Sequence, residues 1–288
     1  MTTATHHRTD QVLPRPLIAI GVPCAGVLLV ALFLIRGFPY DKLGELIAKR
    51  IEQSHGIHLV LGEVGPTLQL AGLALEGTQL RVAFPDRSPQ QIDRALIRPA
   101  WSLSWFAGEP AFHIELEGPS GSADGTLHWN DVVSWVGTIR DARAELPPVS
   151  DWVPIGGFEG VLAATLDVSM GEDGLEGLVE FEIRDGSTTI PGFSAPLPFE
   201  TLTAVANLGG DAYAKVSSLS FDGPLASGSG SGKIARAARI QGAPIGFEFQ
   251  INIKPELSRK VRGGGATINS AGDALVKISG TVKKPKVR

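Results

Sequence analysis

The segment Phe247-Glu248-Phe249-Gln250-Ile251-Asn252-Ile253-Lys254 alternates an apolar side chain with a polar or charged one at every step. Successive side chains of a β-strand point to opposite faces of a sheet, so this period of two predicts a strand with one buried and one solvated face. The same alternation occurs at residues 79–84, 112–117 and 276–282. Because it replaces any helical period after residue 57, the sequence predicts a mainly β fold.

Two other alternating segments are joined by a turn. Residues 158–168 and 175–184 each place apolar side chains on one face, and Gly171, Asp173 and Gly174 lie between them. Glycine and aspartate favour turns, so the pattern predicts an antiparallel hairpin. The sequence Gly157-Phe158-Glu159-Gly160-Val161 also recurs 17 residues later as Gly174-Leu175-Glu176-Gly177-Leu178, and each copy is expected to open a strand.

An antiparallel sheet with one apolar face must cover that face. A closed sandwich or barrel covers it internally. A curved sheet that stays open leaves a groove, and such a groove would suit acyl chains. The alternation is the same in both architectures, so both remain open at this stage.

Three segments interrupt the alternation. Residues 99–107, with Trp101 and Trp105, and residues 131–138, with Trp135, are predicted to be helical or irregular, their tryptophans covering an open end of the sheet. The segment Gly228-Ser229-Gly230-Ser231-Gly232 has two interpretations, a flexible linker or a glycine-rich, poorly packed strand or loop.

The amino-terminal region contains an apolar run without charged residues, from residue 17 to residue 35. A helix rising about 1.5 Å per residue would make this run about 28 Å long, close to the bilayer hydrocarbon thickness of about 30 Å. We therefore expect a transmembrane helix at residues 17–36 after a tail at residues 1–16. A cleaved signal peptide fits less well because its apolar region is usually about 7–15 residues long.

A short amphipathic helix is expected directly after the apolar run. Between Pro39 and Gly56, apolar residues recur at helical spacing, namely Leu43, Leu46, Ile47 and Ile51. This predicts a helix over residues 40–55 within a juxtamembrane segment at 37–56, followed by a β-rich domain at 57–288. The count of positive charges would put the carboxyl side in the cytoplasm, but that rule is weak beside a long domain, so the charges leave the orientation open.

Composition argues against several functional classes. The chain has 288 residues, 26 Lys+Arg and 30 Asp+Glu, hence a net charge of −4, which argues against a nucleic-acid-binding protein. Its one cysteine, Cys24, excludes an intramolecular disulfide framework. No HExxH, phosphate-loop or GxSxG motif occurs. We therefore predict no enzyme, and no catalytic, cofactor-binding or metal-binding residues.

Positive charge gathers near the carboxyl end, at Lys277, Lys283, Lys284, Lys286 and Arg288, together with Arg259, Lys260 and Arg262. Lysines on an outermost strand protect it from pairing with other chains. The alternative interpretation is a surface that docks on anionic lipid headgroups or an acidic partner.

Several segments follow the apolar run in a recognisable order. They are Phe38-Pro39-Tyr40-Asp41-Lys42-Leu43, Gly62-Glu63-Val64-Gly65-Pro66, Leu73-Ala74-Leu75-Glu76-Gly77, Ala95-Leu96-Ile97-Arg98-Pro99 and the closing Leu275-Val276-Lys277-Ile278-Ser279-Gly280-Thr281-Val282. In this order the chain resembles the N subunit of bacterial type II secretion systems, GspN, in its deltaproteobacterial form. That family is itself similar to AsmA-like envelope proteins.

The resemblance implies a single-pass protein of the bacterial inner membrane, with a cytoplasmic tail and a periplasmic, curved, AsmA-like β-sheet domain. It implies a structural or assembly role in type II protein secretion, with the other secretion subunits as partners, and it carries over no catalytic residues. Exposed strand edges would then make the contacts by β-augmentation. The alternative is an AsmA-like module that binds or transfers membrane lipids.

Overall fold

The described part of the chain is an antiparallel β-sheet with one α-helix. The computed structural model describes residues 26, 37–69, 72–83, 88–100, 108–130, 132–147, 150, 158–171, 174–188, 196–237, 240–254 and 273–287. In chain order the elements are α2 (Tyr40–His55), β1 (His58–Val60), β2 (Val64–Gln69), β3 (Gly72–Ala83), β4 (Gln90–Pro99), β5 (Ala111–Gly118), β6 (Gly121–His128), β7 (Val133–Arg143), β8 (Phe158–Gly171), β9 (Gly174–Thr188), β10 (Leu197–Leu208), β11 (Ala212–Asp222), β12 (Ala226–Ala235), the 3-10 turn η2 (Ile240–Gly242), β13 (Ile245–Ile253), β14 (Asp273–Thr281) and β15 (Lys284–Val287). The predicted mainly β, antiparallel class is confirmed.

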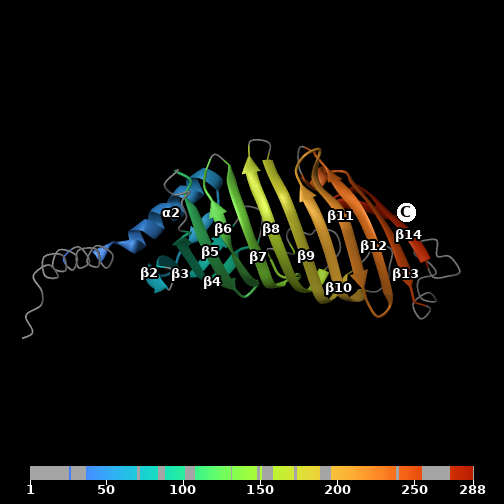
Figure 1. The fold of residues 1–288 in the computed structure, drawn as a ribbon, viewed down its shortest axis with the longest axis horizontal. Coiled ribbons are helices and arrows are strands. Elements are labelled where there is room, and N and C mark those ends of the chain that lie inside the picture. Colours follow the sequence, from blue (N-terminus) through green and yellow to red (C-terminus); the bar gives the residue numbers. More distant parts are fainter. Residues whose placement is uncertain are drawn as a thin grey trace, which may run out of the picture.

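The strands form a meander in which nearly every strand pairs with its sequence neighbours. The order runs from β1 through β3 and then in sequence to β15, while β2 pairs with the first half of β3 and β1 with its end. Figure 1 shows the strands side by side along the long axis, with α2 at one end and β13 and β14 at the other. At about 4.8 Å between strands, the sheet extends roughly 60 Å.

Helix α2 has the bounds that the sequence predicted. It follows Pro39 and ends at Gly56, whose left-handed φ of 66° allows its N–H to donate to the Glu52 carbonyl. The buried Gly44 lies against the side chains of Leu61 and Val64, so one contact of the helix is made at a residue without a side chain. Leu46, expected on the apolar face, is instead 66% exposed.

The predicted transmembrane helix at 17–36 and the tail at 1–16 lie, apart from Gly26, outside the described residues. Within the described ranges, no helix has the length and hydropathy needed to cross a bilayer.

The predicted hairpin is confirmed. Strands β8 and β9 pair from Phe158 opposite Thr188 to Gly171 opposite Gly174. The two copies of the repeated sequence open these strands, as expected.

The prediction for residues 131–138 was wrong, because β7 begins at Val133. Gly137 occupies a position at which the alternation would place an apolar side chain, so the strand pattern of this segment cannot be recognised in the sequence. The Trp135 ring lies where side chains of Gly125 and Gly137 would otherwise stand, so this tryptophan covers its own strand and the neighbouring β6 rather than an open end of the sheet. Of the other interrupted segment, Pro99 ends β4, and residues 101–107 lie outside the described residues.

The glycine–serine segment is a strand and not a linker. It forms the middle of β12, between β11 and β13. Gly228, Gly230 and Gly232 lie opposite Ile251, Phe249 and Phe247 of β13. The rings of Phe221, Phe249 and Phe247 occupy the space beside these glycines, which explains why the alternation here is Gly with Ser instead of apolar with polar.

The predicted last strand corresponds to β14, and one further strand, β15, follows it through a tight turn. Its Lys284 and Lys286 are exposed, and Pro285 offers no backbone N–H. Proline and lysine are typical of protected sheet edges, so β15 is a poor template for an added strand.

Candidate functional site

One face of the sheet is apolar across its whole centre. Cross-strand partners share a face, so the pairing defines rows that cross β5 to β10. In order from β5 to β10, the first row contains Phe112, Leu127, Trp135, Val168, Gly177 and Leu208. The second row contains Ile114, Gly125, Gly137, Leu166, Val179 and Ala206. The third row contains Leu116, Ala123, Ile139, Ala164, Phe181 and Ala204. We call the face that carries these rows the inner face. All its side chains in these rows are apolar.

The inner face is only partly covered in the centre of the sheet. Leu166, Val168, Val179 and Phe181 are half-buried rather than buried. Helix α2 makes its main contacts with β1 and β2, at one end of the sheet (Figure 1). Among the described residues, the centre of the inner face is therefore a large apolar surface in contact with solvent.

The inner face is closed along one side by a bend in the strands. The pairing shifts register at Ile139/Ala142 in β7 and at Glu159/Val161 in β8. Asp141 and Asp185 take left-handed φ values of 52° and 50° beside these shifts. β-Bulges bend strands and increase their twist, so aligned bulges in neighbouring strands fold that margin inward. We call this line the crease.

A compact apolar cluster fills the crease. Its buried members are Ala142, Ala144, Leu162, Ile183, Phe199 and Leu202. Phe199 also fills the space beside Gly186, where a side chain would collide with the ring. Further clusters around Ile251 and Val276, and around Ile245 and Val282, bury the end of the inner face near β12–β14.

The opposite, outer face carries the charged residues of the same strands. On β3–β5, Arg94 Nε donates to Glu76 Oε1 at 2.6 Å, and this hydrogen bond raises the pKa of Arg94. On β9, Arg184 donates to both carboxylate oxygens of Glu182, at 2.8 and 2.9 Å. These pairs are exposed or half-exposed, where an ion pair contributes little to stability.

Removing Arg184 should change the titration of its partner. The hydrogen bonds from Arg184 hold the pKa of Glu182 below its ordinary value, so the pair stabilises the fold above the ordinary pKa and loses this effect as pH falls through the lowered one. In Arg184→Gln, carbon-detected NMR should show the pKa of Glu182 rising towards its ordinary value. Arg140→Gln on β7 is the control and should leave the pKa of Glu182 unchanged. An equal rise of this pKa in Arg140→Gln would point to general charge screening instead of the hydrogen bonds from Arg184.

The structure gathers three possible metal ligands that the sequence analysis missed. His113 Nε2 lies 3.3 Å from Glu115 Oε1 and 3.0 Å from Asp124 Oδ2, on the outer face of β5 and β6. Arg98 Nε lies 4.0 Å from the same Glu115 oxygen and is buried without a hydrogen-bond partner. Because this guanidinium already supplies positive charge beside the carboxylate, we interpret the group as an ion-pair network. The alternation of His113 and Glu115 on one strand face was the available signal.

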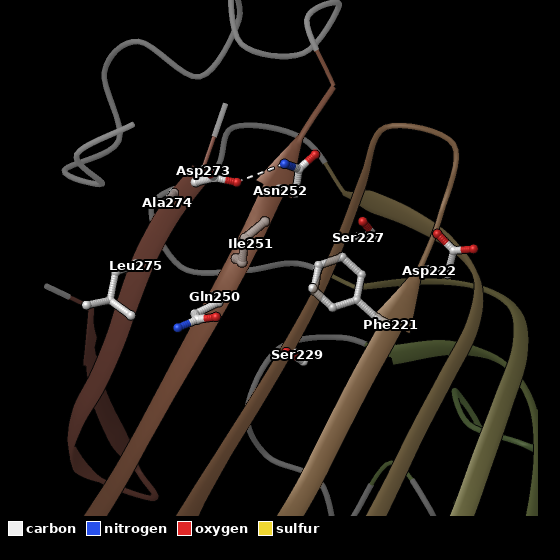
Figure 2. Close-up of a pocket in the computed structure, with 11 residues that line it drawn as sticks. Phe221, Asp222, Ser227, Ser229, Gln250, Ile251, Asn252, Asp273, Ala274 and Leu275 are labelled. Carbon is white, nitrogen blue, oxygen red and sulfur yellow. Dashed lines mark hydrogen bonds between the residues drawn. The ribbon is translucent and has the colours of Figure 1, made fainter. Parts of the chain in front are cut away.

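A hollow of about 820 Å³ lies at the strand ends of β11–β14 (Figure 2). Its lining comes mainly from two outer-face rows. One row contains Asp222, Ser227, Asn252 and Asp273, and the other contains Ser229, Gln250 and Leu275. The Asn252 side chain donates to Asp273 Oδ1 at 2.8 Å. The small Ser227 and Ser229 side chains lie between longer ones and leave this space, so its shape follows from the glycine–serine strand. It offers polar contacts and no activated nucleophile.

The sequence analysis predicted no catalytic, cofactor-binding or metal-binding residue, so there is no predicted site residue to locate in the structure. The feature that the geometry adds is the inner face, whose apolar side chains the sequence identified and whose openness it left undecided. Compared with known proteins, the chain matches no protein-family model, no curated protein and no solved structure.

Proposed function

We propose that the chain is an anchored, periplasmic subunit of a bacterial type II secretion system with a structural or assembly role. Support comes from the resemblance of its ordered segments to the N subunit. The observation that carries the proposal is the long meander, with α2 at one end and the last strands roughly 60 Å away. Such a sheet, anchored before α2, would hold a contact surface well away from the inner membrane.

Deletion of the gene in the native organism tests this proposal. We expect secreted proteins to disappear from the culture supernatant while the envelope keeps its resistance to a hydrophobic antibiotic, and complementation to restore secretion. The detergent-solubilised full chain should also copurify secretion subunits. Unchanged secretion together with no copurified subunit would reject the role.

A second candidate function is the binding or transfer of membrane lipids, as an AsmA-like module. The half-buried, uncharged rows of the inner face favour it. Burial of apolar surface contributes about 25 cal/mol per Å², so an alkyl chain lying on several rows would gain substantial free energy. The same rows would otherwise leave Leu166, Val168 and Phe181 in partial contact with water.

Lipid content of the purified protein tests this second candidate. Full-length protein extracted in mild detergent should carry phospholipid, and delipidated protein should take it up again from vesicles of phosphatidylethanolamine and phosphatidylglycerol. Leu166→Asp on the inner face should reduce the uptake severalfold, because a carboxylate opposes apolar burial. Thr165→Asp, next to it on the outer face, should not. Delipidated wild-type protein that takes up no lipid would exclude this function.

A further inference from the structure

The edge of the sheet near the carboxyl end is covered over only half of its length. Strand β14 pairs with β13 from Asp273 to Ile278, whereas the short β15 pairs with β14 only from Ile278 to Thr281. Within the described ranges, no strand pairs with the other side of residues 274–277. A strand edge with open backbone groups is a template for pairing with another strand. We call residues 273–277 the half-edge.

The backbone groups of Leu275 and Lys277 point away from β13, towards the open side of the half-edge. Successive residues of an antiparallel strand direct their N–H and C=O groups alternately to the two sides. Directly after β14, the Val282 N–H donates to the Ala243 carbonyl at 3.0 Å, in the register of the β13–β14 pair. The even-numbered residues of β14 therefore face β13, and the odd-numbered ones face the opposite side.

The sequence of the half-edge is complementary to itself. When Asp273-Ala274-Leu275-Val276-Lys277 runs antiparallel to a second copy with Leu275 at the centre, Asp273 lies opposite Lys277 of the second copy. Leu275 then lies opposite its own copy, and its N–H and C=O have the direction needed to exchange two hydrogen bonds with it. Opposite charges at directly opposed positions favour such a pair, and like charges disfavour it.

The exposure of these residues agrees with the same register. Asp273, Leu275 and Lys277 are exposed on the outer face, Leu275 by 50%, whereas Ala274 and Val276 are buried on the inner face. Cross-strand partners share a face, and the register pairs odd-numbered residues with odd-numbered ones. Each face of one copy therefore continues into the same face of the other.

Charged and polar neighbours on β13 extend this complementarity. Lys277 Nζ donates to Glu248 Oε1 at 2.6 Å, and the Asn252 side chain donates to Asp273 Oδ1 at 2.8 Å. In the paired arrangement, Lys277 would lie between the Glu248 carboxylate of its own chain and the Asp273 carboxylate of the second copy. The resulting row alternates negative, positive and negative charge across three strands.

We infer that two copies of the chain pair through the half-edge, across a two-fold axis that passes between the two Leu275 residues. The contact between Asp273 and Lys277 then occurs twice, as an isologous contact requires. The two copies form one sheet of roughly 120 Å, twice the span of one copy, with an α2 helix at each end (Figure 1). The contact is short, so we expect a reversible dimer that depends on concentration. This inference goes beyond both proposed functions and depends on neither.

Cysteine crosslinking tests the register. The detergent-solubilised full chain carries Cys24→Ser together with either Leu275→Cys or Ser231→Cys, and it is treated with a short thiol-reactive crosslinker. In the proposed dimer the Cβ atoms of the two copies at position 275 lie about 4.5–5.5 Å apart, so Leu275→Cys should give a crosslinked dimer. Ser231 is exposed on the same face but belongs to β12, and its variant should remain monomeric. No crosslink at position 275, or an equal yield at position 231, would overturn the proposal.

Charge reversal tests whether the partner is a second copy. Asp273→Lys and Lys277→Glu should each weaken self-association of the full chain by about tenfold or more, because like charges then face each other at both contacts. Asp222→Lys, a charge reversal on the outer face of β11, is the matched control and should retain the dimer.

A mixture of the two half-edge variants separates lost pairing from lost folding. One variant has lysine at both positions and the other has a carboxylate at both, so differently tagged copies should copurify in the mixture although each variant alone is monomeric. If the mixture stays monomeric, or if wild-type protein shows no self-association at any concentration tested, the second copy is rejected as the partner of the half-edge.

Discussion

Ile183→Ala is expected to lower the free energy of unfolding by about 2–5 kcal/mol, the usual cost of truncating a fully buried aliphatic side chain. Ile183 is 4% exposed and packs in the crease with Leu162 and Leu202. The irregular backbone that follows it at Asp185 is held by strand pairing with β8 and β10, so the space left by the missing carbons cannot easily be filled. Urea unfolding of the detergent-solubilised full chain, followed by tryptophan fluorescence, measures the loss.

Leu178→Ala provides the matched control. It lies on the same strand, on the outer face, and is 37% exposed. Its truncation removes little buried area and should change stability by no more than about 0.5 kcal/mol. Similar losses for the two variants would mean that the crease cluster does not hold this margin of the sheet closed.

The strands were predictable because their signal is local. Residues 247–254 alternate strictly, and the hairpin of β8 and β9 alternates over most of its length. The structure places most of the apolar members of each segment on one face. The helix over Tyr40–His55 was predictable for the same reason, since Pro39 and Gly56 mark its ends. Local period and turn residues therefore determine most of the elements.

The crease was not predictable because its signal is a backbone conformation. Asp141 and Asp185 each follow an arginine within an otherwise alternating strand. Aspartate tolerates the left-handed region better than most residues, yet in sequence it is indistinguishable from an ordinary outer-face carboxylate. Since the bulges decide whether the margin bends inward, they also decide whether the apolar face is closed or open, which the alternation alone left unresolved.

The His113, Glu115 and Asp124 group shows a second limit of sequence reasoning. Its members come from two strands, and only the pairing of Glu115 with Asp124 brings them together. Register between strands depends on turns as well as on alternation. The sequence therefore predicted the face of each residue but not its neighbours.

Gly230→Val is expected to destabilise the protein by about 1–3 kcal/mol or more, the usual cost of overpacking. A Cβ at Gly230 would lie 2.5 Å from Phe249 Cδ1 and 2.6 Å from the Glu248 carbonyl oxygen. The ring can rotate away from the new side chain, but the carbonyl belongs to β13 and moves only with that strand. Thermal unfolding of the full chain should report a lower transition temperature.

Ser229→Val separates packing from strand preference, because it places the same side chain one residue earlier on the outer face. Valine favours strands, and Ser229 is exposed, so stability should change by no more than about 0.5 kcal/mol. A double-mutant cycle with Phe249→Ala then isolates the ring. If Gly230 exists to make room for Phe249, the double variant loses less stability than the two single losses combined. Strict additivity would assign the whole cost to the β13 backbone and remove the ring as the reason for glycine in this strand.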